Sequence, residues 1–262
     1  MKSQSIILRK FWGIYFWFVF GGSLILLFPL FWLLLRSEKT YPAANRLRKV
    51  WGNIIMAFTG VYYQVEFESP IDPNQPVILC ANHSSILDIP FFAFILPAKF
   101  CFMAKKEFAE IPIFGHFFKT VDIPVDRENR MSSFKAFKAT QKRLEEGYNV
   151  IIFPEGRANP SPPEMLPFKN GPFKMAIECK VPIVPITFID NWHRFLFHAE
   201  TFGGSPGVLR VKVHAPVYTQ NMEASDYNIL LKEVRQKIET PLIETYGSQQ
   251  GINTEYSHFS KA

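Results

Sequence analysis

The chain has 262 residues, a net charge of +6, 48% hydrophobic residues and 27 phenylalanines. This length fits one large domain, or one domain with an appendage, and the apolar content exceeds what a single water-soluble core needs. A basic chain attracts anionic lipids, nucleic acid or anionic metabolites, but no zinc-finger, helix-turn-helix or RNP-like pattern is present, which argues against a nucleic-acid partner. Cys80, Cys101 and Cys179 are widely spaced, which predicts buried reduced thiols and neither a disulfide framework nor structural zinc.

The first predicted element is an uncharged run from Phe11 to Leu35, bracketed by basic residues. It is long enough to span a bilayer, and its tryptophans lie near its two ends, as interfacial aromatic residues do. Because more basic residues follow the run than precede it, we expect membrane lipids as partners and the rest of the chain on the cytoplasmic face of the cell inner membrane. Gly21, Gly22, Ser23 and Pro29 are potential bend points, so spanning and re-entrant arrangements both stay open. Residues 41–60 predict a second, interfacial helix.

The remainder alternates short β-branched runs with longer amphipathic ones, which is typical of an α/β domain. The predicted strands are residues 62–67, 76–81, 99–104, 121–124, 149–153, 183–189 and 208–214. The predicted helices are residues 86–95, 112–119, 129–146, 171–179 and 225–245. We therefore expect a mixed, largely parallel sheet flanked by helices. The expected domains are membrane-associated helices in residues 1–60, an α/β domain in residues 61–246 and a flexible tail in residues 247–262.

One stretch, Asn-His-Ser-Ser-Ile-Leu-Asp over residues 82–88, directly follows a predicted strand and places His83 five positions before Asp88. A histidine that is oriented by a carboxylate can act as a general base near neutral pH. A helix capped near Ser84 or Ser85 would let Asp88 reach back to one ring nitrogen, while the other faces the substrate. The same spacing is more often a helix cap beside a solvated side chain. The residues at the other strand ends are therefore needed to distinguish a catalytic pair from a cap.

Three further stretches carry candidate chemistry at or near strand ends. Residues 123–127, Ile-Pro-Val-Asp-Arg, end in Arg127, which suits binding of a phosphate or carboxylate, with a surface ion pair to Asp126 or Glu128 as the alternative. Residues 153–157, Phe-Pro-Glu-Gly-Arg, close a strand with a carboxylate and a glycine turn, or form an ordinary strand-ending turn. Residues 181–186 contain two prolines, which indicates an edge or irregular strand. His83 and Glu155 both fall beyond strand ends, where ligands bind in open α/β sheets.

In this order and spacing, the four stretches resemble the four sequence blocks of the glycerolipid acyltransferase family, whose best-known bacterial members are 1-acyl-sn-glycerol-3-phosphate acyltransferases (lysophospholipid acyltransferases). Residues 104–107, 111–115 and 168–176 also resemble that family. The resemblance covers roughly residues 40–220. The His-x4-Asp block followed by Phe-Pro-Glu-Gly is highly specific as a pair, although neither part is specific alone.

The resemblance implies a membrane-bound O-acyltransferase that moves an acyl chain from acyl-coenzyme A or acyl-carrier protein to the sn-2 hydroxyl of 1-acylglycerol-3-phosphate, giving phosphatidic acid. It implies that His83 is the general base and that Asp88 orients and polarises it, with no acyl-enzyme, no cofactor and no metal. It also implies that Arg127 and Lys105 or Lys106 bind the acceptor's phosphate and that Glu155 with Gly156 shapes the acceptor site. The candidate substrate-binding residues are therefore Asn82, Ser84, Lys105, Lys106, Arg127, Glu155, Gly156 and Arg157.

Two blocks depart from the family pattern. Arg157 and Ala158 stand where the family has threonine and arginine, and Val121 replaces a glycine. Either Arg157 supplies the guanidinium from a shifted position or the acceptor's head group differs, so a phosphate-free lyso-lipid such as an N-acyl amino-acid lipid is the alternative acceptor.

Three other functional classes make different demands on the sequence. A lipid esterase would need a Gly-x-Ser-x-Gly turn, which the sequence lacks. A non-catalytic membrane scaffold would not need the His83–Asp88 pair, and a metal-dependent hydrolase would need further ligands beside Glu155.

The segment 190–195 is expected to be a packed loop, with contact to the donor or the membrane as the alternative. The histidines at positions 116, 193, 198, 214 and 258 lack ligand spacing and are expected to be structural or at the surface.

Overall fold

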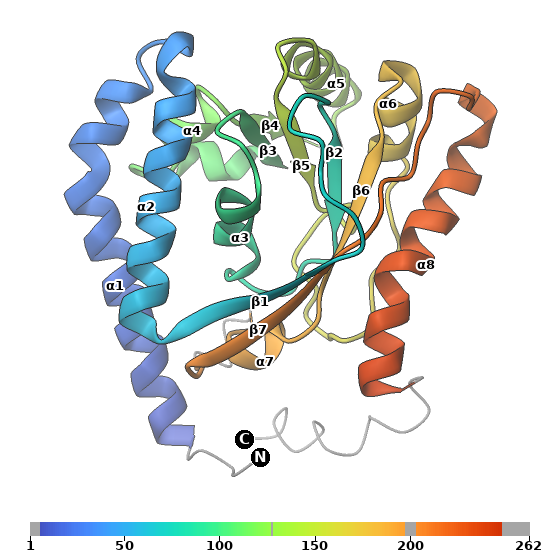
Figure 1. Cartoon of the computed structure of the whole chain (residues 1–262). Helices are drawn as coiled ribbons and strands as arrows, with labels where there is room; N and C mark the ends of the chain where they lie inside the picture. Colours follow the sequence, from blue (N-terminus) through green and yellow to red (C-terminus); the bar gives the residue numbers. More distant parts are fainter. Residues whose placement is uncertain (1–5, 127, 197–202, 248–262) are drawn as a thin grey trace.

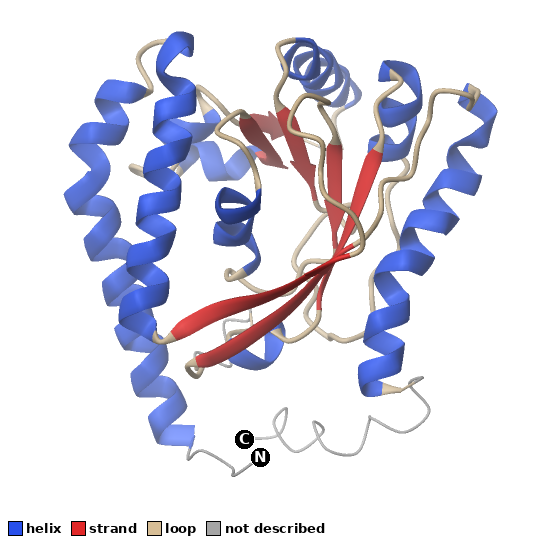
Figure 2. Cartoon of the chain, viewed as in Figure 1, coloured by secondary structure: helices blue, strands red, loops and turns tan. Residues whose placement is uncertain are grey.

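The protein is described by a computed structural model that covers residues 6–126, 128–196 and 203–247. Helices α1 (Ile6–Leu34) and α2 (Tyr41–Thr59), joined through the 3-10 turn η1 (Glu38–Thr40), run side by side at one flank of the molecule (Figure 1). Helix α3 (Asp88–Ile95) lies between α2 and the central sheet, and α6 (Gly171–Cys179) and α8 (Tyr227–Tyr246) lie on the far side of the sheet. Figure 2 shows the resulting helix–sheet–helix arrangement.

The sheet of the described chain has seven strands in the order β1-β7-β6-β2-β5-β3-β4. Their bounds are Val61–Phe67 for β1, Ile78–Ala81 for β2, Phe100–Lys105 for β3, Ile123–Val125 for β4, Asn149–Ile152 for β5, Ile183–Phe188 for β6 and Gly207–Val213 for β7. Strands β6 and β7 pair antiparallel, and the other neighbours pair parallel. The prediction of a mixed, largely parallel sheet flanked by helices is therefore confirmed.

Several predicted boundaries are wrong, for local reasons. The predicted helix over 112–119 is helical only in α4 (Gly115–Phe118), because Ile113 has a φ of 66° and breaks the run after the 3-10 helix η2 (Lys106–Glu110). Strand β4 begins at Ile123, not at Val121, which is buried before it. The remaining helical segments are α5 (Arg130–Glu145), α7 (Asn191–Arg194) and η4 (Ala224–Asp226).

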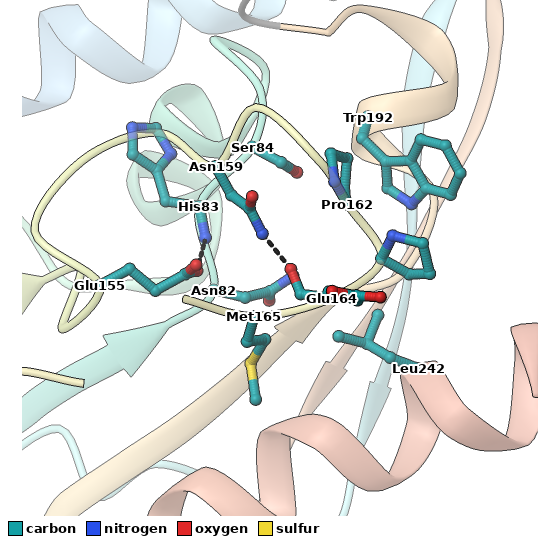
Figure 3. A pocket seen from close by; sticks show the side chains of 11 residues that line it. Asn82, His83, Ser84, Glu155, Asn159, Pro162, Glu164, Met165, Trp192 and Leu242 are labelled. Atoms are coloured by element: carbon teal, nitrogen blue, oxygen red, sulfur yellow. Dashed lines mark hydrogen bonds between the residues drawn. The ribbon is translucent and has the colours of Figure 1, made fainter. Parts of the chain in front are cut away.

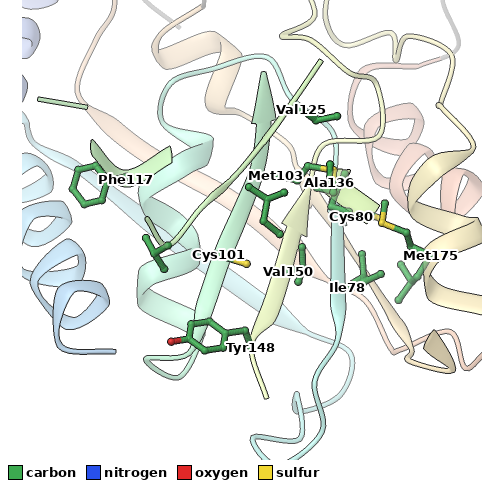
Figure 4. Packing of buried hydrophobic residues seen from close by; sticks show 14 of the residues in the cluster. Ile78, Cys80, Cys101, Met103, Phe117, Val125, Ala136, Tyr148, Val150 and Met175 are labelled. Atoms are coloured by element: carbon green, nitrogen blue, oxygen red, sulfur yellow. The ribbon is translucent and has the colours of Figure 1, made fainter. Parts of the chain in front are cut away.

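The core lies on both faces of the sheet, because alternate side chains of a strand point to opposite faces. Ile78, Cys80 and Val150 pack with α5 and α6 on one face (Figure 4), and Leu79 and Ile151 pack with α3 on the other. The strands at the centre of the sheet, β2, β5 and β6, are buried along their whole length, as expected when helices cover both faces. Cys80 and Cys101 are buried thiols as predicted, but Cys179, at the end of α6, is only partly buried.

Helix α1 has two different faces. Phe16 and Phe31 are buried against the rest of the molecule, whereas Phe18 is 75% and Leu26 81% exposed. The segment Ile7–Leu34 is long and apolar enough to cross a membrane, with a mean hydropathy of 2.1, and only 11% of its most apolar window is buried. Such low burial distinguishes α1 from the core helix of a soluble domain.

Candidate functional site

The candidate site residues follow strands that end at one edge of the sheet. Strands β2, β5, β3 and β4 are neighbours and run parallel, so their carboxyl ends lie together. His83 follows β2, Glu155 follows β5, Lys105 ends β3 and Asp126 follows β4. With a strand spacing of about 4.8 Å, the sheet spreads these groups over roughly 15 Å. Arg127 lies outside the described residues, as do His198 and His258.

Two contacts with described residues position the imidazole of His83. Its Nδ1 lies 2.8 Å from Oδ2 of Asp88, and its ring stacks on Phe153 with the ring centroids 4.0 Å apart. Because a carboxylate is an acceptor, Nδ1 carries the proton and Nε2 keeps a basic lone pair in the neutral ring. The side chain of His83 is 15% exposed, so the ring is held at the surface of the fold without being sealed inside it.

Asp88 is fully buried and is satisfied by four hydrogen-bond donors. Its Oδ2 accepts from the backbone amides of Ser84 and Ser85, both at 2.9 Å, in addition to His83. Its Oδ1 accepts from Nδ2 of Asn191 at 2.7 Å. The expected cap of α3 at Ser84 or Ser85 is wrong, because Asp88 itself takes these two amides and the helix begins at Asp88. The carboxylate therefore fixes both the turn and the imidazole.

Glu155 binds the main chain next to the histidine. Its Oε1 accepts the backbone N–H of His83 at 2.9 Å, and its Oε2 accepts that of Leu166 at 2.8 Å. Burial raises the pKa of Glu155 to about 7, although these two hydrogen bonds act to lower it. Because both oxygens serve backbone amides, the structure gives Glu155 a positioning role, which differs from direct contact with an acceptor. Gly156 beside it has a φ of 86°, a conformation that favours glycine.

The loop after Glu155 closes over the main chain of His83 (Figure 3). The backbone N–H of Asn159 donates to the carbonyl of His83 at 2.7 Å, and the Asn159 amide donates to the carbonyl of Glu164. A small recess lies between this loop, Trp192 of α7 and Leu242 of α8. The imidazole of His83 points away from this recess, so the substrate face of the ring lies elsewhere.

Of the predicted substrate-binding residues, Asn82 and Ser84 differ in whether their side chains already have a partner. Both polar atoms of the Asn82 side chain bond to the backbone of Phe188 in β6, at 3.0 and 2.8 Å, so this side chain clamps β2 to β6. The Ser84 hydroxyl is buried and has no hydrogen-bond partner among the described residues. Asn82 is therefore structural in this conformation, whereas Ser84 keeps an uncommitted hydroxyl.

The predicted cations lie at the surface. Lys105 pairs with Glu107 at 2.9 Å, Lys106 pairs with Asp126 at 2.7 Å, and Arg157 is exposed. The hydrogen bond and charge of Asp126 raise the pKa of Lys106, which keeps it cationic. An incoming phosphate would compete with carboxylates for these lysines, in pairs that are weak because they are solvated. No group of three His, Cys, Asp or Glu side chains suited to hold a metal is present among the described residues.

Sequence reasoning missed two residues of this site. Asn191 lies in the segment that was expected to be a packed loop, and Asn159 follows the third block. The only local signal was a buried-type strand followed by a polar Asp-Asn pair at 190–191, which does not specify a partner 103 positions away.

The chain is similar to known acyltransferases in both sequence and structure. The family model Acyltransferase matches residues 63–189. The chain is 31% identical over 185 residues to an uncharacterized acyltransferase from Schizosaccharomyces pombe, covering 70% of this chain and 66% of that protein. It is 34% identical to a 1-acyl-sn-glycerol-3-phosphate acyltransferase from Helicobacter pylori, covering 44% of this chain and 48% of the relative, and 30% identical to 1-acyl-sn-glycerol-3-phosphate acyltransferase alpha from Mus musculus, covering 69% and 64%.

These alignments span about half to two thirds of the curated relatives' lengths. Among solved structures, the 1-acyl-sn-glycerophosphate (LPA) acyltransferase PlsC from Thermotoga maritima superposes with a TM-score of 0.72 at 23% identity. This match covers 92% of the chain and 98% of that structure, and it shows a shared fold.

Proposed function

This chain belongs to the acyltransferase family, and we propose that it is a membrane-bound O-acyltransferase that acylates the sn-2 hydroxyl of 1-acylglycerol-3-phosphate to give phosphatidic acid. The observation that carries the proposal is the contact between Nδ1 of His83 and the buried carboxylate of Asp88, at the carboxyl end of β2. The acyl donor is a thioester, either acyl-coenzyme A or acyl-carrier protein.

The reaction needs two proton transfers, one to His83 and one from it. Nε2 of His83 takes the proton from the acceptor hydroxyl as its oxygen attacks the thioester carbonyl. Asp88 stabilises the imidazolium that forms and keeps the ring in the correct tautomer. When the tetrahedral intermediate collapses, the carbon–sulfur bond breaks and the imidazolium returns the proton to the leaving thiolate. No acyl-enzyme is required, because the acceptor itself is the nucleophile.

The phosphate of the acceptor is assigned to the basic groups beyond β3, β4 and β5. Lys105 and Lys106 lie at the end of β3, and Arg127 and Arg157 follow β4 and β5 in the sequence. A guanidinium binds phosphate through two parallel hydrogen bonds, and a lysine adds a point charge. The parallel strands β3, β5 and β2 bring Lys105 and Lys106 to the edge of the sheet that carries His83.

A membrane location supplies both lipid substrates. The exposed apolar face of α1 is suited to contact with acyl chains, and the basic residues that follow α1 are suited to anionic head groups. Contacts along the whole of α1, from Arg9 with His193 to Phe31 with Phe117, favour a helix that lies against the domain within one leaflet. We place the domain on the cytoplasmic face of the inner membrane, because basic residues lie at both ends of α1 and suit the anionic lipids of that leaflet.

The test is acyl transfer by purified protein in detergent, with wild type compared with His83→Ala, Asp88→Asn and a control, His116→Ala. Lysophosphatidic acid and an N-acyl amino-acid lipid are offered side by side with a labelled acyl-coenzyme A and a labelled acyl-carrier protein. The expected result is transfer to lysophosphatidic acid that falls by at least about a thousandfold in His83→Ala and persists in the control. Folded wild-type protein that transfers to neither acceptor would overturn the proposal.

One observation favours a second acceptor. Ala158 removes the guanidinium that the family places at this position, and Arg157 is exposed. Transfer only to the phosphate-free N-acyl amino-acid lipid, still dependent on His83, would keep the mechanism and assign the protein to a different lipid product.

A further inference from the structure

The turn that follows β6 contacts Asp88 at the carboxylate oxygen that does not bind His83. Asn191, the first residue of α7, is fully buried and donates from Nδ2 to Oδ1 of Asp88 at 2.7 Å. It is the donor that the structure shows for Oδ1, whereas Oδ2 receives all three of the other hydrogen bonds. The Asn191 amide therefore stabilises the charge of the carboxylate and fixes its rotation about the Cβ–Cγ bond.

The second polar atom of the same amide points to a role beyond packing. Oδ1 of Asn191 is buried and has no hydrogen-bond partner among the described residues. A buried acceptor without a partner is unfavourable, so an apolar residue of similar size would be the better choice if the position only filled space. An asparagine at position 191 leaves its oxygen unsatisfied, but it supplies the N–H donor to Asp88.

The same turn also joins the site to α1. The carbonyl of Phe195 accepts the hydroxyl of Ser85 at 2.5 Å, next to the amide that binds Asp88. The ring of Phe195 is buried against Phe16 of α1, with centroids 4.9 Å apart, and against Trp12 at 5.9 Å. Displacement of α1 would therefore move the turn that supports Ser85 and Asp88.

We propose, on the basis of the proposed function, that the turn Asn191–Phe195 is the positioning element of the His83–Asp88 pair, with Asn191 holding the carboxylate and Phe195 joining it to α1. Asn191 acts through Asp88 and touches neither substrate. Among the described residues, the titratable side chains that interact with Asp88 include His83, Glu155 and Tyr63, whose hydroxyl donates to the carbonyl of Leu87.

Two variants of Asn191 separate positioning from packing. Asn191→Leu keeps the volume and removes the donor at every pH. Asn191→Asp places two carboxyl groups in contact, and such a pair holds one proton between them until the pH is high enough to remove it. While that proton is present, the new side chain can donate to Asp88 as the amide does, so its activity becomes pH-dependent in a way that packing alone would not produce.

The expected result is a fall of about ten- to a hundredfold in kcat for Asn191→Leu, with KM for the acceptor within about twofold of wild type. Asn191→Asp is expected to approach wild-type kcat near about pH 5 and to lose it as the pH rises toward about 9. Wild-type kcat in Asn191→Leu, or a loss that merely follows a lowered unfolding temperature while Asn191→Asp shows no added pH dependence, would overturn the proposal.

A spectroscopic measurement keeps this test separate from the proposed function. The Nδ1 proton of an imidazole bonded to a buried carboxylate gives a far-downfield proton resonance, assigned here by its absence in His83→Ala. We expect this resonance to shift or broaden in Asn191→Leu even if no acceptor is ever acylated. A resonance that is unchanged in Asn191→Leu would overturn the positioning role. If wild type is inactive but the resonance shifts in Asn191→Leu, only the enzymatic assignment is overturned.

The link to α1 is tested with a buried phenylalanine of that helix and an exposed phenylalanine of α5. Phe16→Ala removes the ring that packs on Phe195, and the control Phe134→Ala removes a ring that is 58% exposed. In detergent, Phe16→Ala is expected to lower kcat by about threefold or more and to shift the His83 resonance, while Phe134→Ala leaves both unchanged. Equal behaviour of the two variants would overturn the link.

Discussion

The backbone N–H of His83 donates to Oε1 of Glu155 at 2.9 Å, so the first and third sequence blocks meet through a side chain and a main chain. Glu155 is 4% exposed, and its other oxygen accepts the backbone N–H of Leu166. The carboxylate therefore ties the end of β2 to the loop after β5. Its role in the site depends on keeping the main chain of His83 in place beneath the imidazole.

Glu155→Gln should be destabilising, and the effect should depend on pH. The amide keeps one acceptor, so one of the two backbone donors loses its partner at a cost of about 1–3 kcal/mol. Burial raises the pKa of Glu155 to about 7, so its contribution to stability is fully present below about pH 4.5 and is lost as the pH rises through 7. The difference in the free energy of unfolding between wild type and the variant should therefore become smaller from about pH 4.5 to about pH 8.

The measurement is the free energy of unfolding of both proteins across this pH range, together with kcat at each pH. Glu164→Gln, the same change at an exposed position on the same loop, is the control and should cost less stability than Glu155→Gln. A gap for Glu155→Gln that widened as the pH rose would contradict the direction of the shift, because one pKa unit corresponds to about 1.4 kcal/mol.

The sequence could predict which strands carry the site, because each block sits at the end of an apolar run and parallel strands end at a common edge. It could also place Asp88 near His83, since five residues allow a local turn. It could not predict the contact of Asn191 with Asp88, because no local pattern relates a residue after β6 to one after β2. The failed helix at 112–119 has a local cause: Ile113 has a φ of 66°, and the chain turns so tightly there that a Cβ on Gly115 would lie 2.3 Å from the carbonyl oxygen of Ala109.

Glu68 predicts a second pH effect, at the opposite edge of the sheet. Although burial acts to raise its pKa, the backbone N–H of Ala215 and the neighbouring His214 and Lys212 together lower the pKa of Glu68 to about 2. Its contribution to stability is therefore present above about pH 4.5 and is lost as the pH falls toward 2. Glu68→Gln should be less stable than wild type at pH 7 by about 1–2 kcal/mol, after allowance for partial exposure, and nearly equal to it at pH 2.

Unfolding in urea at several pH values measures this difference. Glu66→Gln is the matched control, because Glu66 is 70% exposed and also pairs with Lys212. If both variants lost the same stability at pH 7, the buried hydrogen bonds of Glu68 would not be the cause.

Arg48 and Asp122 form a buried ion pair that fastens α2 to the β3–β4 edge. Their side chains are 10% and 3% exposed, the nitrogen–oxygen distance is 2.5 Å, and the guanidinium also lies over the ring of Phe117. Arg48→Met leaves the Asp122 charge buried without its partner and should cost about 3–5 kcal/mol. Thermal unfolding should show that the exposed Lys142→Met costs less than about 1 kcal/mol and that adding Asp122→Asn to Arg48→Met restores part of the loss.

Helix α1 should bind lipid through its exposed face. Phe18 and Leu26 are 75% and 81% exposed on that face, and a carboxylate at either position would have to enter the apolar layer or pull the helix out of it. The double variant Phe18→Glu/Leu26→Glu should reduce the fraction that sediments with neutral phospholipid vesicles by roughly tenfold or more. Phe134→Glu, on α5, is the matched control, since Phe134 is 58% exposed on a helix without such an apolar run, and it should sediment as wild type does.

Binding driven by apolar burial should also survive high salt, because screening weakens only the contribution of the basic residues. Loss of binding in the control alone would move the membrane contact from α1 to α5.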